Sequence, residues 1–355
     1  MSFEITIEPL EERVDVEEGQ TLLDAALRAG IYLPHACGHG LCGTCKVEVL
    51  EGDIDHGEAS DFALLPVERD EGKCLACCAT ALSDVVIEAD VEEDPDAKRF
   101  AVRDYTTVVS RIETLTPRIK SIFLAIEHDG LGFQAGHYIN LLLPGMEDEP
   151  RAFSIANPPS EKNLIELNVA LVEGGPATTY LHNELQVGDE LKFSGPYGRF
   201  FVRESAPEPM IFLAGGSGLS SPKSLVLDLF ERGETREVTL IYGARNQNEL
   251  YYAELFRELE REHANFHYLP VLSEEPEDSG WEGSRGFVHE AAKTHFNGMF
   301  AGHKAYLCGP PPMIDACITT LMQGRLFERD IYLEQFYTRA NRDNASRSPL
   351  FKTLG

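Results

Sequence analysis

Apolar and polar residues alternate in two short runs at the start of the chain, from Phe3 to Pro9 and from Glu11 to Val16. This period of two predicts a β-hairpin. An amphipathic helix is expected from Thr21, with its apolar residues on one side and Gly30 at its end. Two later apolar runs are expected to be strands, at residues 46–49 and 85–87. The first part of the chain is therefore predicted to be a small sheet that covers one helix.

Short strands separated by turn residues are predicted in the middle of the chain. Their apolar runs lie at residues 105–109, 119–125, 138–143, 164–172 and 190–193. Many short strands in succession are typical of a small antiparallel barrel.

The pattern changes again after Pro209. Met210 to Ala214 is a wholly apolar run, which predicts a buried strand. Similar runs follow at residues 238–242, 266–271 and 305–307, with helical patterns such as residues 250–262 between them. This alternation indicates a doubly wound parallel sheet, in which ligands bind at the carboxyl ends of the strands.

These patterns divide the chain into three predicted domains and a tail. The domains are expected at residues 1–95, 100–205 and 206–340, and the charged, apolar-poor residues 92–98 are expected to link the first two. Residues 341–355 are polar and without periodicity, so they are expected to be loose. A length of 355 residues fits two or three domains.

Charge and hydropathy narrow the class of protein. The net charge is -28, and the first hundred residues hold 24 acidic and 7 basic side chains. This charge disfavours nucleic acid as a partner, whereas an acidic surface steers basic protein partners or simply keeps a protein soluble. No apolar run approaches the roughly 18 residues of a spanning helix, and the start of the chain lacks a signal sequence. A cytoplasmic protein that does not bind membranes is expected.

The cysteines point to a metal site. Eight cysteines without a signal sequence favour metal binding or reactive thiols over disulfides. Cys37, Cys42 and Cys45 have the C-x4-C-x2-C spacing of a plant-type two-iron two-sulfur cluster, which needs a fourth thiolate farther along. Three cysteines could supply it: Cys74, Cys77 and Cys78.

The same cysteines allow a zinc interpretation. Cys42-x2-Cys45 with Cys74-x2-Cys77 has the spacing of a zinc ribbon. Zinc would leave Cys37 without a role, together with the glycine-rich loop that follows it. Glycines in such a loop permit positive φ angles and allow N–H groups to point at a buried anionic cluster. The spacing therefore favours iron and sulfide.

Two stretches of the middle domain fit a dinucleotide with a flavin ring. Arg151-Ala152-Phe153-Ser154 offers a guanidinium for a pyrophosphate, an aromatic face for a ring and a hydroxyl for a ring nitrogen. Residues 174–181 form a glycine turn that opens a short helix, and the free N–H groups of a helix N-terminus bind phosphate. Either stretch alone is a weak signal, and each supports the other.

These residues together resemble the ferredoxin-reductase family. The cysteine loop with Leu75-Ala76-Cys77, the Arg151 and Gly174 stretches with Gly195-Pro196-Tyr197-Gly198, and the glycine turn after residue 214 follow in the family's order. The sequence around the cysteines most resembles that of the reductases of phenol hydroxylases. The resemblance implies a β-grasp ferredoxin domain, an antiparallel flavin-binding barrel and a nicotinamide domain.

The resemblance also implies roles for single residues. Leu75-Ala76-Cys77 matches the family's last ligand pattern, so the expected cluster ligands are Cys37, Cys42, Cys45 and Cys77. Arg151 would hold the FAD pyrophosphate, Phe153 would pack on the flavin, and Ser154 would bond near flavin N5. The other side of the pyrophosphate would lie on Gly175, Ala177 and Thr178. Val169 would line the ring pocket, although a core position explains this strand residue equally well.

In the last domain the expected nicotinamide residues lie at strand ends. They are Gly215, Gly216, Ser217, Gly218, Arg245, Glu274, Cys308, Gly309 and Pro310. The turn is not a G-x-G-x-x-G fingerprint. Cys308 would pack near the nicotinamide and is, with Ser154, a candidate catalytic residue; a buried strand-end cysteine is the alternative. Phe336 would cover the flavin.

The choice of nicotinamide can be argued from charge. Relatives that use NADP carry a Ser-Arg pair where this chain has Ser273-Glu274-Glu275. Carboxylates repel a 2′-phosphate and accept hydrogen bonds from a ribose hydroxyl. NADH is therefore expected. Arg245 is the residue whose positive charge would allow NADPH as the alternative.

The implied function is electron delivery. NADH gives up two electrons as a hydride and an iron–sulfur cluster accepts one, so a flavin between them is required. We expect a monomeric NADH-dependent reductase that passes electrons through FAD and the cluster to a transiently bound di-iron hydroxylase of a phenol-type monooxygenase. The alternatives are a reductase for a ring-hydroxylating dioxygenase or a methane-type monooxygenase, and a zinc-stabilised redox-sensing module.

Overall fold

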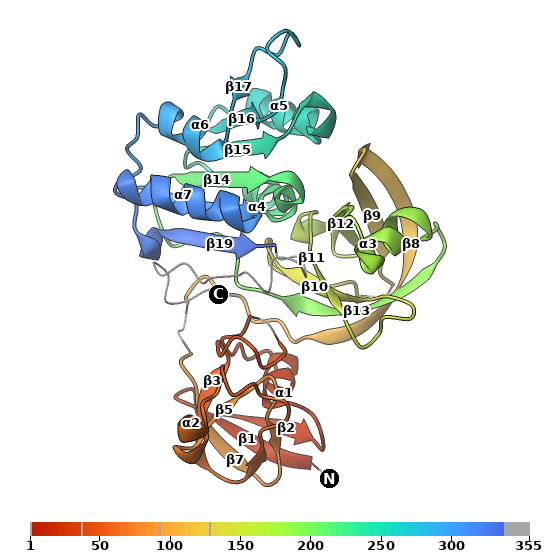
Figure 1. Ribbon diagram of the computed structural model, residues 1–355, viewed down its shortest axis with the longest axis vertical. Helices are drawn as coiled ribbons and strands as arrows, with labels where there is room; N and C mark the ends of the chain where they lie inside the picture. The colour runs from red at the N-terminus through yellow and green to blue at the C-terminus, as the bar shows by residue number, and fades with distance from the viewer. Residues whose placement is uncertain (1, 37, 92–93, 128, 337–355) are drawn as a thin grey trace. The chain divides into compact units, whose positions relative to one another are not determined.

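The computed structural model describes residues 2–36, 38–91, 94–127 and 129–336. The chain forms two compact units, one ending at Arg103 and the other beginning at Asp104, and each is considered by itself (Figure 1). The expected tail, residues 341–355, lies outside the described residues. In the described part of the chain no helix is both long and apolar enough to cross a bilayer.

The first unit is a five-stranded sheet in the order β2-β1-β7-β3-β5, packed on helix α1. The β1–β2 hairpin is antiparallel, with Phe3 opposite Val16, and β7 runs parallel to β1. Thr21 Oγ1 accepts a hydrogen bond from Asp24 N–H and caps α1, while Gly30, at a φ of 80°, follows its end. The elements are β1 (Ser2–Glu8), β2 (Glu12–Glu17), α1 (Leu22–Arg28), β3 (Lys46–Glu51), β4 (Ile54–Asp55), α2 (Pro66–Asp70), β5 (Lys73–Leu75), β6 (Thr80–Ala81) and β7 (Val85–Glu88).

The second unit begins with an antiparallel six-stranded sheet in the order β11-β10-β13-β8-β9-β12. Its strands enclose a core that includes Ile122, Ile139, Leu167 and Phe193. The first strand is longer than the expected residues 105–109, because a strand with two register shifts continues to Thr116. The elements are β8 (Arg103–Thr116), β9 (Ile119–Ala125), β10 (Tyr138–Leu142), β11 (Arg151–Ser154), η1 (Pro159–Glu161), β12 (Leu164–Ala170), α3 (Pro176–Asn183) and β13 (Glu190–Tyr197).

A parallel six-stranded sheet follows, in the order β17-β16-β15-β14-β18-β19, and is coloured green to blue in Figure 1. Alternate residues of β14 face its two sides: Phe212 packs with helices α4 and α5, and Leu213 packs with α6 and α7. The elements are β14 (Met210–Gly215), η2 (Gly216–Leu219), α4 (Ser220–Glu231), β15 (Val238–Ala244), η3 (Gln247–Glu249), α5 (Ala253–Glu262), β16 (Phe266–Leu272), β17 (Ser284–Arg285), α6 (Val288–His295), β18 (Lys304–Gly309), α7 (Pro311–Gln323), η4 (Glu328–Asp330) and β19 (Ile331–Gln335).

Two details of this sheet differ from the expected pattern. The helix expected over residues 250–262 begins only at Ala253, because Tyr252 has a left-handed backbone with a φ of 56°. Residues 331–335, just before the Phe336 that is expected to cover the flavin, form the edge strand β19, parallel to β18. This strand was not expected from the sequence.

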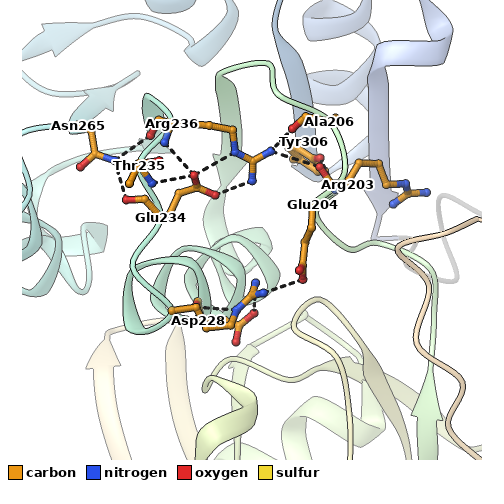
Figure 2. A network of polar contacts seen from close by, with 10 residues as sticks. Arg203, Glu204, Ala206, Asp228, Glu234, Thr235, Arg236, Asn265 and Tyr306 are labelled. Carbon is orange, nitrogen blue, oxygen red and sulfur yellow. Dashed lines mark hydrogen bonds and ion pairs between the residues drawn. The ribbon is translucent and has the colours of Figure 1, made fainter.

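A polar network fixes the peptide that connects the barrel to the parallel sheet (Figure 2). The Arg236 guanidinium donates to the carbonyl oxygens of Arg203 and Ala206 and pairs with Glu234. Arg232, near the end of α4, bonds Glu204 of the connecting peptide at 2.8 Å. The connection is thus held to the sheet at several points.

Candidate functional site

The cysteine loop of the first unit meets the end of β5. Gly40 N–H donates to Cys77 Sγ at 3.3 Å, and Ala76 N–H donates to the carbonyl oxygen of Cys45 at 2.9 Å. Cys45 and Cys77 are both buried. Gly40 has a φ of 71°, and a Cβ added there would lie 2.6 Å from Cys78 Sγ, so only glycine fits. An N–H aimed at a cysteine sulfur suits a thiolate that carries negative charge. Cys37 lies outside the described residues.

The four cysteines of the zinc alternative, Cys42, Cys45, Cys74 and Cys77, are all described. Within the described residues, no three His, Cys, Asp or Glu side chains gather around one point in the manner of a metal site. This result applies to both interpretations, because Cys42, Cys45 and Cys77 are also three of the expected cluster ligands. Cys74 is fully buried in β5, and burial raises the pKa of its thiol to about 12. It is therefore a neutral thiol in the core.

Three predicted flavin residues lie on strand β11 of the barrel. Ser154 is buried, and Phe153 is half-buried against the barrel core opposite Ile139. Arg151 lies at the start of the strand, where its guanidinium is 2.7 Å from the carboxylate of Glu149. This pair is partly exposed, so an anion of higher charge can compete with Glu149 for the guanidinium.

The predicted phosphate loop opens helix α3. Gly174 has a φ of 71°, Gly175 is the N-cap residue without a side chain to fill the cap, and Pro176 begins the helix. Thr178 Oγ1 accepts from Val172 N–H at 3.1 Å and fixes the turn. The first N–H groups of α3 are thus left for a ligand phosphate. The Val169 side chain lies in the barrel core with 1% exposure, as its alternative interpretation anticipated.

The glycine turn after β14 packs on the end of β18. A Cβ added to Gly218 would lie 2.5 Å from the carbonyl oxygen of Cys308, so the two backbones are in direct contact. Tyr251 Oη donates to the carbonyl oxygen of Gly216 at 3.0 Å. Gly309 follows Cys308, and its carbonyl oxygen accepts from Phe336 N–H at 3.1 Å. The predicted nicotinamide residues at the ends of β14 and β18 are therefore neighbours.

One carboxyl group joins the flavin and nicotinamide sides. Glu334 Oε2, on β19, accepts from Ser154 Oγ at 3.1 Å, from Ser221 Oγ at 2.5 Å and from Cys308 Sγ at 3.3 Å. Both predicted catalytic residues thus converge on a residue that the sequence analysis did not single out. Burial raises the pKa of the Cys308 thiol well above its usual value. Cys308 is therefore an uncharged group suited to packing against a ring.

The candidate residues for cofactor selectivity lie at the ends of β15 and β16. Glu274 N–H donates to the carbonyl oxygen of Arg245 at 2.7 Å, and both side chains are exposed. Glu275 is engaged with Gln247, whose backbone and side-chain N–H groups donate to its carboxylate. Glu274 is thus the carboxylate left to face a ribose, with Arg245 next to it.

Three parts of the chain match known protein families. Residues 5–82 match 2Fe-2S iron-sulfur cluster binding domains, residues 103–202 match oxidoreductase FAD-binding domains, and residues 212–318 match oxidoreductase NAD-binding domains. The chain is 59% identical, over the whole of both chains, to the reductase component DmpP of phenol 2-monooxygenase from Pseudomonas sp. (strain CF600). The chain belongs to the phenol hydroxylase reductase family.

Other reductases are also similar to this one. It is 55% identical, over the whole of both chains, to the phenol hydroxylase P5 protein of Acinetobacter pittii (strain PHEA-2). A crystal structure of the Amycolatopsis reductase GcoB is 35% identical, with a TM-score of 0.84 over 94% of this chain and 98% of that one. The predicted ferredoxin domain, flavin-binding barrel and doubly wound nicotinamide domain are confirmed, as are their three cofactors.

The buried carboxyl group of this reductase gives a prediction about pH. Burial raises the pKa of Glu334, against the opposing effect of its three hydrogen bonds. A carboxyl whose pKa is raised by folding stabilises the fold while protonated, and this contribution is lost as pH rises through the folded-state pKa. Glu334→Gln keeps the shape and removes the titration. We expect the melting temperature of the variant, relative to the wild type, to rise as pH increases above the ordinary carboxyl pKa of 4.5.

The measurement is thermal unfolding of the FAD-loaded protein at several pH values. Glu282→Gln, at an exposed position in the nicotinamide domain, is the matched control and should show no trend. A difference between Glu334→Gln and wild type that does not change with pH would contradict a buried, titrating Glu334.

Proposed function

We propose that this reductase takes electrons from NADH and passes them, through FAD and a two-iron two-sulfur cluster, to the hydroxylase of a phenol-oxidising monooxygenase. The observation that carries the proposal is the 59% identity to a phenol 2-monooxygenase reductase component over the whole chain. The convergence of Ser154, Ser221 and Cys308 on Glu334 supports it, because flavin and nicotinamide residues meet there. The assignments below follow from this proposal.

The cluster ligands are assigned to Cys37, Cys42, Cys45 and Cys77. The choice of Cys77 over its neighbours is supported by the Gly40 N–H at 3.3 Å from its sulfur and by the desolvated thiol of Cys74. The proposed domain boundaries are residues 1–95, 100–205 and 206–340. Under this assignment the ferredoxin domain holds the last electron carrier before the hydroxylase.

FAD is assigned to the barrel. Arg151 and the N–H groups at the start of α3, around Gly175, Ala177 and Thr178, would bind its pyrophosphate, and Phe153 and Phe336 would contact the ring. When bound, FAD supplies the conversion of one two-electron donor into two single-electron transfers. The protein orients the reactants: Glu334 fixes the Ser154 hydroxyl, and the neutral Cys308 thiol excludes water without adding charge.

NADH is assigned to the turn at Gly215, Gly216, Ser217 and Gly218 together with Cys308, Gly309 and Pro310. Glu274 is proposed to accept a hydrogen bond from the adenosine ribose and to disfavour a 2′-phosphate. Arg245 lies beside it, and its positive charge favours NADPH.

The acceptor is proposed to be a di-iron hydroxylase that binds a monomer of this chain transiently. The first hundred residues carry 24 acidic and 7 basic side chains, which suits fast, salt-dependent encounter with a basic surface. A cytoplasmic location is proposed because NADH and reduced cysteines belong to that compartment.

The test is an absorption spectrum of the purified protein before and after NADH. Bands of both a flavin and a two-iron cluster should bleach, and NADH should act faster than NADPH. Equal rates would contradict the role of Glu274, and a protein with no visible absorption would overturn the proposed function.

Salt should slow electron transfer to the purified phenol hydroxylase, since screening weakens charge steering. Faster reduction of a ring-hydroxylating dioxygenase or of a methane-type monooxygenase would identify a different acceptor.

A further inference from the structure

A buried ion pair links the barrel to the nicotinamide domain. Lys223 Nζ lies 2.7 Å from Glu166 Oε2, and each side chain is only 6% exposed. Glu166 belongs to β12 of the barrel, and Lys223 belongs to α4, which packs on the parallel sheet. Other ion pairs of the second unit, such as Lys304–Asp330, are more exposed. Because a buried ion pair adds little net stability, its position calls for another explanation.

The pair reaches the segment that carries Ser154. Lys223 Nζ also donates to the carbonyl oxygen of Ala156 at 3.1 Å, and Ser224 Oγ donates to that of Asn157 at 2.7 Å. Ala156 and Asn157 follow Ser154 closely in the chain. The start of α4 is therefore bonded to the backbone just beyond the proposed flavin contact.

The same turn of α4 also holds the nicotinamide side. Ser221, two residues before Lys223, donates to Glu334, and the helix follows directly on the glycine turn. The far end of α4 is bonded to the connecting peptide through Arg232 and Glu204 (Figure 2). Within one helical turn, neighbouring side chains thus contact both Glu334 and the segment that follows Ser154, and the helix is fixed at both ends.

Tyr252 completes the arrangement. Its hydroxyl donates to Glu166 Oε1, and Lys223 Nζ lies 4.6 Å from the centre of its ring, in cation–π contact. Burial, and then the nearby Glu166, raise the pKa of Tyr252, so it remains a donor. The residue before it, Tyr251, bonds the carbonyl oxygen of Gly216. The left-handed backbone at Tyr252 allows the two adjacent tyrosines to bond different partners. Tyr252 bonds Glu166 of the ion pair, and Tyr251 bonds the glycine turn.

We propose that Lys223 is a positioning residue, which with Glu166 and Tyr252 sets the distance between the flavin-binding segment and the nicotinamide-binding turn. This inference rests on the proposed function. A change of about 1 Å in such a distance lowers a reaction rate by up to about 100-fold. Lys223 is not itself one of the residues proposed to contact FAD or NADH. It acts through its bond to Ala156 and through its own helix.

The test compares four variants of the full-length, FAD-loaded protein. Lys223→Met leaves a buried carboxylate unpaired and destabilises the fold, so the decisive variant is Lys223→Met with Glu166→Gln, which removes both charges. Lys304→Met, which breaks an ion pair within the nicotinamide domain, is the matched control. Stopped-flow reduction of the flavin at increasing NADH concentrations gives a limiting rate and an apparent Kd.

We expect the double variant to retain its FAD and its reduction by dithionite, with a limiting rate at least tenfold lower and an apparent Kd for NADH within about twofold of wild type. Lys223→Arg should recover part of the rate. Hydrogen exchange of residues 155–158 and 217–221 should be faster in the double variant and unchanged in Lys304→Met.

A double variant with the limiting rate and hydrogen exchange of the wild type would overturn the positioning role. An equal fall in rate for Lys304→Met would also overturn it, because any lost ion pair would then have the same effect. Failure of the proposed function is a separate outcome: the wild-type flavin would then not be reduced by NADH at all.

Discussion

The Cys77→Ser variant is expected to purify without its iron–sulfur cluster, while its FAD is still reduced by NADH. The Cys77 sulfur accepts the Gly40 N–H, and the strand end that carries it is bonded to Cys45. A serine oxygen is a poor replacement for a thiolate that holds iron. Because FAD belongs to the other compact unit, its reduction does not depend on the cysteine loop.

Iron and sulfide analysis together with the visible spectrum measures this effect, which should be a nearly complete loss. Cys74→Ser and Cys78→Ser are the matched controls. Cys74 is a fully buried core thiol, so its replacement should lower stability and leave the iron content intact. Normal iron in Cys77→Ser with iron lost in Cys78→Ser would move the ligand assignment by one residue.

The Gly218→Ala variant is expected to lose at least about 100-fold in the rate of flavin reduction by NADH. The added methyl group would lie 2.5 Å from the carbonyl oxygen of Cys308 and 2.7 Å from Gly309 Cα. These are backbone atoms that cannot rotate away, so the glycine turn and the end of β18 must separate. That separation would displace Cys308 from Glu334.

Gly216→Ala is the comparison that separates a clash from backbone strain. A Cβ at Gly216 meets nothing within 4 Å, but its φ of 56° costs an alanine about 1 kcal/mol. We expect a loss of several-fold there, measured in the same stopped-flow experiment. Both variants should bind FAD normally, and similar rates for the two would show that close packing of Gly218 on Cys308 is not needed.

Local pattern was enough to predict most of the fold. The hairpin of β1 and β2 follows from alternation, and the buried strand β14 follows from an unbroken apolar run. The alternation gives the face of each side chain, and turn residues give the strand ends. It did not predict β19, since the sequence Ile331-Tyr332-Leu333-Glu334-Gln335 fits a terminal extension equally well.

Long-range contacts account for what sequence pattern did not reveal of the site. Ser154 was identified from its own motif, but its partner Glu334 lies 180 residues away, on a strand that was not expected. Lys223 follows two serines and a proline, a polar sequence that indicates an exposed helix start, and it is nevertheless buried. A glutamate directly after apolar residues, as in Tyr332-Leu333-Glu334, was the available signal for a buried carboxyl.

Strand β19 also fixes the order in which the protein becomes competent during its own synthesis. Domains near the N-terminus fold first as a chain leaves the ribosome, so the cysteine domain is complete while the parallel sheet is still being made. Glu334, which joins the flavin and nicotinamide sides, is on the last strand of the sheet. The contacts of Glu334 therefore form only after the cysteine domain has been made.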